Sequence, residues 1–170
     1  HPDVNARAGP ALYEATALFL AADQGKSATV RALLELGADP SLGLSGFGST
    51  PLLVAAERGH KQTAAALASA HPRDLEQRSS AGLTPLAAAA LTNQLETVQE
   101  LLRLGADPLV RIPSPMDDAQ SDMSLVQYAL NAGRAVRLPT IQFLLGMTAQ
   151  TKALGIEEYD MQVIEVLRMQ

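Results

Sequence analysis

The side chains of this chain that could carry chemistry are few and scattered. Its three histidines are His1, His60 and His71, and no two of them share the spacing that would place them on one helical face as zinc ligands. The chain has no cysteine, so a thiolate ligand, a cysteine nucleophile and a disulfide are all excluded. We therefore expect no metal site and no catalytic residue among these side chains.

Two short loops have the composition of ligand-binding loops but lack the required register. In GLSGFG at 43–48 the glycines do not follow the phosphate-binding spacing, and Pro51 stands where the last glycine would be. DDAQSD at 117–122 lacks both the central glycine and the closing glutamate of a calcium loop, so we expect a solvated acidic loop. These failures predict a protein that is not an enzyme and has no cofactor and no small-molecule substrate.

The composition indicates closely packed helices with small side chains. Hydrophobic residues make up 47% of the chain but aromatic residues only 4%, so the core must consist mainly of Ala, Leu and Val. The net charge is −5 and no basic stripe is present, which argues against nucleic acid as a partner. The apolar run 86–91 is far too short to span a bilayer, so no membrane is expected. The absence of cysteine fits a cytoplasmic protein, although a nuclear or secreted effector stays open.

A repeat of 34 residues organises most of the chain. A threonine followed two places later by leucine occurs at Thr16, Thr50 and Thr84, and a weaker copy begins at Ser124 after a step of 40. The phrase GADP occurs at 37–40 and again two steps later at 105–108. One repeating unit accounts for both patterns.

The residues around Thr50 predict the structure of one unit. Threonine is a good helix N-cap, and Pro51 then falls at the first helical position, where its missing N–H costs nothing. Gly59 can end this helix in the left-handed conformation, and a second helix follows from about 60 to 70. In the other units that second helix ends at the glycine of GADP, whereas here Pro72 ends it without a glycine and a left-handed turn is not assured.

The motifs TPL, AA, GH, LL and GADP at these offsets resemble the ankyrin repeat over about 3–148. A step of 34 also fits tetratricopeptide repeats, but those lack the Gly-Ala-Asp hairpin. The resemblance implies an all-α solenoid of about four helix-turn-helix units, joined by β-hairpin-like loops and closed by a C-terminal capping helix. The implied segments of one 1–170 domain are an end of a preceding repeat or an N-terminal cap (1–15), repeats at 16–49 and 50–83, a repeat with a long loop (84–123), a degenerate repeat (124–150) and a capping helix (151–170).

Several positions depart from the family pattern. The histidine that usually follows Thr-Pro-Leu is replaced by Phe19, Leu53, Ala87 and Gln127, and Asn93 stands at one helix-ending glycine. Asparagine tolerates the left-handed region, so we expect this turn to be kept. By the same resemblance His60 has a structural role in the turn between helices, whereas His71 is expected to be solvated.

The opening residues 3–7 resemble the hairpin that closes an ankyrin repeat, which favours a fragment of a longer protein over a natural N-terminal cap. The implied function is protein–protein interaction, as part of a larger scaffold or regulatory protein. The alternative is a stand-alone bacterial-type ankyrin protein that inhibits or neutralises one enzyme or toxin. The implied partner is another protein or peptide, or the remainder of the protein's own longer chain.

In ankyrin arrays, partners bind the hairpin tips and the concave face formed by the first helices. Carried over by position, the implied binding residues are Asp23, Gln24, Phe47, Ser49, Glu57, Arg58, Leu83, Leu91, Thr92 and Arg111. Leu83 and Leu91 are expected to be exposed and so to form an apolar patch, unless Leu83 is buried in its own hairpin. The long loop 109–123 is a second candidate.

Overall fold

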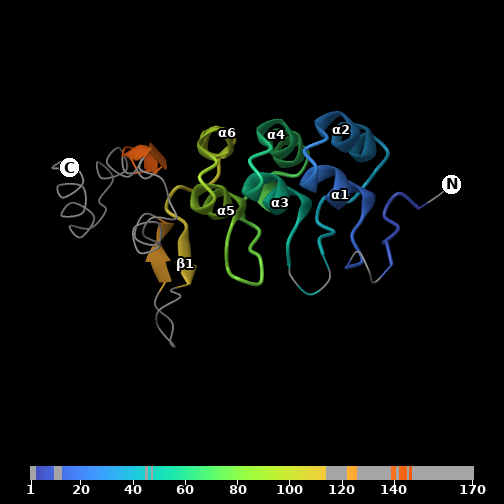
Figure 1. Ribbon diagram of the computed structural model, residues 1–170, viewed down its shortest axis with the longest axis horizontal. Helices are drawn as coiled ribbons and strands as arrows, with labels where there is room; N and C mark the ends of the chain where they lie inside the picture. The colour runs from blue at the N-terminus through green and yellow to red at the C-terminus, as the bar shows by residue number, and fades with distance from the viewer. Residues whose placement is uncertain are drawn as a thin grey trace. The chain divides into compact units, whose positions relative to one another are not determined.

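A computed structural model of the chain describes residues 3–9, 13–44, 46, 48–113, 122–125, 139–140, 142–144 and 146. It contains two compact units, His1–Asp107 and Pro108–Gln170. The first unit carries three helix pairs, which lie side by side in chain order (Figure 1). Among the described helices, none combines the length and the apolar character that crossing a membrane would require.

The helices of the first unit follow the predicted repeat. They are α1 (Ala17–Asp23), α2 (Ser27–Glu35), α3 (Pro51–Glu57), α4 (Lys61–Ala70), η2 (Pro72–Glu76), α5 (Pro85–Leu91) and α6 (Leu95–Arg103). The first helices α1, α3 and α5 contact one another in order, and the second helices α2, α4 and α6 do the same. This arrangement confirms the predicted helical repeat solenoid.

The first helix of every pair begins as the sequence predicts. The hydroxyl oxygens of Thr16, Thr50 and Thr84 accept hydrogen bonds from the backbone N–H groups three residues later, at 3.2, 3.3 and 3.3 Å. Pro51 and Pro85 occupy the first turn of their helices. The same cap in all three pairs explains why the repeat has a regular step.

The turns that end the first helices have positive φ. The values are 67° at Gly25, 77° at Gly59 and 63° at Asn93. Asparagine therefore adopts the left-handed conformation expected for it, because its short polar side chain tolerates this region better than most side chains do.

Two of the second helices end at the glycine of GADP. Gly37 has φ 86° and Gly105 has φ 98°, and the N–H of the following alanine bonds back to the carbonyl of Leu33 or Leu101 at 2.9 or 3.0 Å. The helix α4 has no such glycine. It ends at His71, with φ −140°, and Pro72 then opens the short 3₁₀ helix η2, as expected for a stop made by proline.

The core consists of small aliphatic side chains at equivalent positions. Leu18, Leu52 and Leu86 are buried in the three first helices, and so are Val30, Ala64 and Val98 in the second helices. The side chains that replace the usual histidine, Phe19, Leu53 and Ala87, are also buried. Apolar packing thus occupies the position that a polar side chain holds in the family pattern.

The segment 3–6 has the turn that closes a repeat. The N–H of Asn5 bonds to Oδ1 of Asp3 at 2.9 Å, and the N–H of Ser41 bonds to Oδ1 of Asp39 at the same distance. The Asn5 side chain also accepts from the N–H of Asp39 at 2.8 Å, so consecutive turns are joined. Continuation into a longer array stays a prediction.

The second unit is described only in part. Strand β1 (Arg111–Pro113) pairs antiparallel with β2 (Asp122–Ser124), with Ile112 opposite Met123. Residue 125 and the described residues from 139 to 146 have helical backbone, and the degenerate repeat stays a prediction. The loop tip at 114–121, most of the degenerate repeat and the capping helix at 151–170 lie outside the described residues.

Candidate functional site

An open groove of about 250 Å³ lies between the second and third helix pairs. One wall is α3, which contributes Leu53 and Glu57, and another is α5, which contributes Ala88 and Leu91. The loops complete the groove with Ser49, Ser79, Ser80, Ala81, Leu83 and Thr92. The groove therefore combines residues from two repeats and from the connections that precede them.

Most of the surface that the groove exposes is apolar, although half of its lining residues are polar. Leu53 and Ala88 are buried, while Leu83 and Leu91 are half-buried. The prediction that the last two leucines are exposed is wrong, because both line the groove instead of projecting from the surface. Their remaining exposed area still forms an apolar patch beside polar groups, which is the character expected of a recognition surface.

Small side chains in the third repeat explain why the groove lies between the second and third helix pairs. Ala88 is equivalent to Val54 in the second repeat and to Leu20 in the first. In the connection, Ala81 is equivalent to Tyr13 two steps earlier. These substitutions remove volume at adjacent points of the stack, and a change of a few methyl groups matters in a packed structure. The sequence prediction missed Leu53, Ser79, Ser80 and Ala88, although a comparison of side-chain size between repeats would have indicated the last.

The loop at 79–83 forms a tight hairpin. The N–H of Ser79 bonds to the carbonyl of Leu83 at 3.0 Å, and the Ser79 hydroxyl accepts from the N–H of Leu83 at 3.3 Å. Gly82 has φ 76°, which this turn requires. The preceding hairpin lies close by, because a Cβ on Gly48 would be 3.1 Å from the backbone nitrogen of Ser80. The groove wall is therefore held by backbone contacts on both sides.

Equivalent polar contacts join the ends of the first helices. Arg58 lies 3.2 Å from Asp23 in the ion pair between the first two repeats. One step later, the Thr92 hydroxyl shares its one proton between the backbone carbonyls of Glu57 and Ala88, each at 2.8 Å. The Glu57 carboxylate is exposed, and no cation of the described chain lies within ion-pair distance of it. The Glu57 carboxylate at the mouth of the groove is thus available to pair with a cation.

The structure brings half of the predicted binding residues together. Those that line the groove are Ser49, Glu57, Leu83, Leu91 and Thr92. Asp23 and Arg58 pair with each other, and Gln24 is the exposed C-cap of α1 outside the groove. Arg111 lies on β1 in the second unit, and Phe47 is outside the described residues.

His60 and His71 both have structural contacts. Nε2 of His60 lies 3.0 Å from the carbonyl oxygen of Asp23, in the turn between helices as expected. His71 is not simply solvated, which corrects the prediction, because its Nδ1 lies 2.7 Å from Oδ1 of the buried Asp74. Within the described part of the chain no group of acidic, histidine or cysteine side chains could hold a metal ion.

The shifted pKa values belong to surface side chains outside the groove. Hydrogen bonds from Ser41 lower the pKa of Asp39. On α6, the hydrogen bond with Arg103 lowers the pKa of Glu100 and raises that of the arginine. Among the described residues that line the groove, Glu57 is the carboxylate and none is basic.

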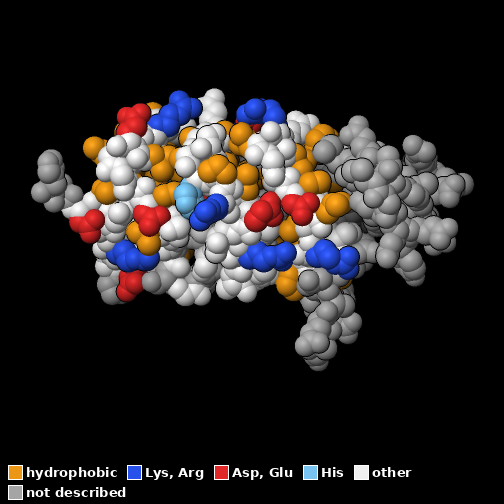
Figure 2. All heavy atoms as spheres, turned by 180° about the vertical axis from the view of Figure 1, so that it is seen from behind, with side chains coloured by type: hydrophobic (Ala, Val, Ile, Leu, Met, Phe, Trp, Pro, Cys, Tyr) orange, Lys and Arg blue, Asp and Glu red, His pale blue; other side chains and the backbone are white. Residues whose placement is uncertain are grey.

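Charges are mixed on the face shown in Figure 2. Acidic and basic side chains of the described residues are interspersed there, with apolar atoms among them. The described part of this face therefore carries both signs of charge close together.

The comparisons with known proteins agree with the repeat architecture. A family model described as "Ankyrin repeats (3 copies)" matches residues 18–112, which is more than half of the chain. The comparison with curated proteins gives no match. Every residue that lines the groove falls within the matched segment.

Proposed function

Because the chain belongs to the ankyrin repeat family, whose members are generally protein–protein interaction modules, we propose that it binds a partner protein through the groove between α3 and α5. The proposal includes a role as one module of a larger scaffold or regulatory protein. The observation that carries it is the convergence of Ser49, Glu57, Leu83 and Leu91 on one groove. These residues come from different repeats and are brought together only by the fold.

The composition of the groove supports binding of a protein segment. Leu83 and Leu91 are half-buried beside the exposed Glu57, so an apolar centre adjoins a polar rim. Protein interfaces commonly obtain most of their binding energy from such a centre, where a partner side chain is fully desolvated.

The groove is also preorganised. The Thr92–Glu57 hydrogen bond joins α5 to α3, and the bonds within 79–83 fix the hairpin. Binding then orders few groups of this chain, which lowers the entropic cost of association.

Site-specific photo-crosslinking tests the proposal. A benzophenone amino acid at the exposed Ser80 should crosslink the full chain to a partner from its source cells, whereas the same group at the exposed Gln99 on α6 should not. Leu91→Glu should abolish the Ser80 crosslink, because it places a charge in the apolar groove. Equal crosslinking from both positions, or a Ser80 crosslink that survives Leu91→Glu, would contradict the proposal.

A further inference from the structure

We propose that the groove accepts one aliphatic side chain of a partner peptide segment, and that Glu57 binds a cationic side chain close to it in the same segment. This inference rests on the proposed function and specifies the chemistry of the partner at the same groove. Its two parts have separate physical grounds. One is the size and lining of the groove, and the other is the Glu57 carboxylate, which has no cation within ion-pair distance among the described residues.

The size of the groove favours a side chain over a small molecule. Sites for small molecules and cofactors usually measure about 300–1,000 Å³ and enclose most of the ligand. The groove has about 250 Å³ and is open on one side, so it is smaller than that range and cannot enclose such a ligand. A single side chain presented by a polypeptide can enter it while the backbone stays outside, near the serine hydroxyls.

The lining selects an aliphatic side chain. Leu53, Ala81, Leu83, Ala88 and Leu91 supply its apolar surface, and among the described lining residues there is neither an aromatic ring nor a positive charge. A charged or amide group placed against these side chains would lose part of its hydration to apolar surface. Leucine, isoleucine, valine or methionine would lose nothing comparable.

The charge at the mouth selects a cation. The acid at the equivalent position of the first repeat, Asp23, is neutralised by Arg58, and the third repeat has Leu91 at this position. Of the two acids at this position of the repeat, Glu57 is therefore the one whose carboxylate has no cation within ion-pair distance in the described part of the chain. It is also the charged residue among the described residues that line the groove. An arginine or lysine of the partner would form a charge-assisted hydrogen bond with it.

The geometry limits how far apart the two partner residues can be. Glu57 and Leu91 are equivalent residues of adjacent repeats, so their separation is set by the packing of α3 against α5. Packed helices lie about 8–10 Å apart and an extended chain rises about 3.3 Å per residue, so the cation and the aliphatic residue should be within about three residues of each other.

Selection from a random peptide library displayed on phage, with the full chain as target, tests the inference. Peptides that bind should be enriched in an aliphatic residue with an arginine or lysine within about three positions. Against Glu57→Lys the basic residue should be replaced by an acidic one, while the aliphatic preference remains. Glu35→Lys makes the same charge change at an exposed position of α2 and should leave the selected pattern unaltered.

A second set of variants tests occupancy of the groove. Ala88→Val fills it with the side chain that the preceding repeat carries at Val54, so the helix should accept the change. Both Ala88→Val and Leu91→Glu should weaken the selected peptides about tenfold or more by fluorescence polarisation. Leu36→Glu places the same charge on a leucine that is 72% exposed and should not weaken them.

The outcomes separate this inference from the proposed function. Peptides that lack the aliphatic–cationic pattern but are blocked by Ala88→Val would overturn the inference and leave the groove as the binding site. Peptides that bind Ala88→Val and Leu91→Glu as well as the unchanged chain would overturn both. Failure to select any peptide, or basic residues still enriched against Glu57→Lys, would also overturn the inference.

Discussion

Nδ1 of His71 lies 2.7 Å from Oδ1 of Asp74, and the Asp74 side chain is only 5% exposed. This pair occurs where other repeats carry Gly-Ala-Asp-Pro, so the diverged end of the second repeat has a polar contact in place of a glycine turn. The other oxygen of Asp74, Oδ2, is buried without a hydrogen-bond partner among the described residues. Among the described residues, the His71 imidazole is therefore the hydrogen-bond partner of the Asp74 carboxylate.

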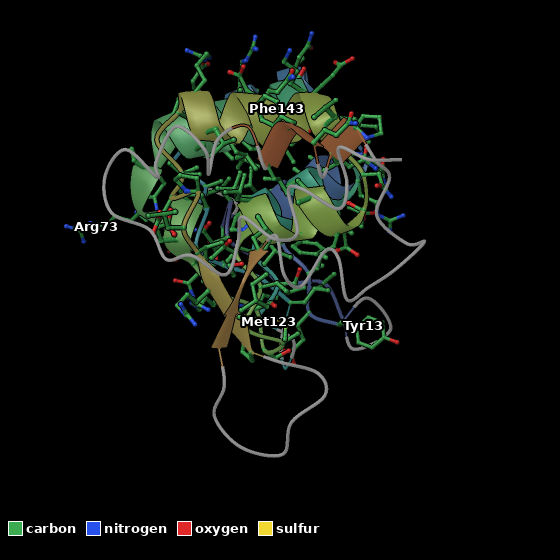
Figure 3. All side chains as sticks on the ribbon, turned by 90° about the vertical axis from the view of Figure 1, so that its left-hand side faces the viewer. Tyr13, Arg73, Met123 and Phe143 are labelled. Atoms are coloured by element: carbon green, nitrogen blue, oxygen red, sulfur yellow. The ribbon has the colours of Figure 1, made fainter. Side chains whose placement is uncertain are left out.

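We expect His71→Ala to destabilise the protein by about 1–3 kcal/mol, because it leaves a buried carboxylate without a partner. Urea unfolding followed by circular dichroism measures the loss. Arg73→Ala is the matched control, since this side chain belongs to the same 3₁₀ turn but points away from the molecule (Figure 3). Equal unfolding free energies for the two variants would show that the His71–Asp74 contact contributes nothing.

The buried hydroxyl of Thr63 gives a prediction of the opposite sign. Its Oγ1 has no hydrogen-bond partner in the described part of the chain. Thr63→Val keeps the shape of the side chain and removes this unsatisfied group, so the free energy of unfolding should rise by about 1 kcal/mol. Thr29 is the equivalent residue of the first repeat and is exposed. Thr29→Val should therefore change stability little, and a loss of stability in Thr63→Val would refute the expectation.

The turn at Asp39 gives a prediction about pH. Ser41 donates hydrogen bonds to the carboxylate from its backbone N–H at 2.9 Å and from its hydroxyl at 2.7 Å, and these bonds lower the pKa of Asp39 below the usual 3.8. Because the folded-state pKa is depressed, the contribution to stability is present above pH 3.8 and is lost as the pH falls through the lower folded-state value.

Ser41→Ala removes the hydroxyl bond but keeps the backbone bond, so the variant should melt below the unchanged protein near about pH 6. The difference between the two melting temperatures should shrink as the pH falls below 3.8. Thermal melts followed across this range measure it. A difference that is constant across the range would mean that the hydroxyl does not act through the carboxylate charge.

The sequence predicts those parts of the fold that depend on interactions between residues close together in the chain. The threonine caps, the proline at the first turn and the left-handed Asn93 each depend on a few adjacent residues, and all are confirmed. Their recurrence at one spacing was sufficient to identify the stack of helix pairs, because each pair alone buries too little apolar surface to be stable.

The candidate site was only partly predictable because it depends on contacts between repeats. Position within the repeat located Glu57 and Leu91 on one surface, but it could not show that Arg58 is already paired with Asp23. The groove also requires Ala88 to be smaller than Val54, which is a comparison of volume and not of pattern. The His71–Asp74 contact was missed because it depends on a 3₁₀ turn after Pro72.

The contact of His60 with Gly25 separates two energetic costs of replacing a glycine in a left-handed turn. These are the strain of the backbone and the clash of the new side chain with its neighbours. Gly25 and Gly37 both have positive φ, at 67° and 86°. A Cβ on Gly37 would meet nothing within 4 Å, whereas one on Gly25 would lie 2.6 Å from Nδ1 of His60. Replacement by alanine therefore strains the backbone at both positions but creates a side-chain clash at only one.

Gly37→Ala should accordingly cost about 1–2 kcal/mol, the usual price of a left-handed alanine, and Gly25→Ala should cost more. The excess should disappear when both glycine variants are compared in a His60→Ala background, because the clashing ring is then absent. Unfolding free energies of the single and double variants complete the thermodynamic cycle. If the excess persisted without the ring, the backbone of the first turn and not the contact between repeats would be the more sensitive element.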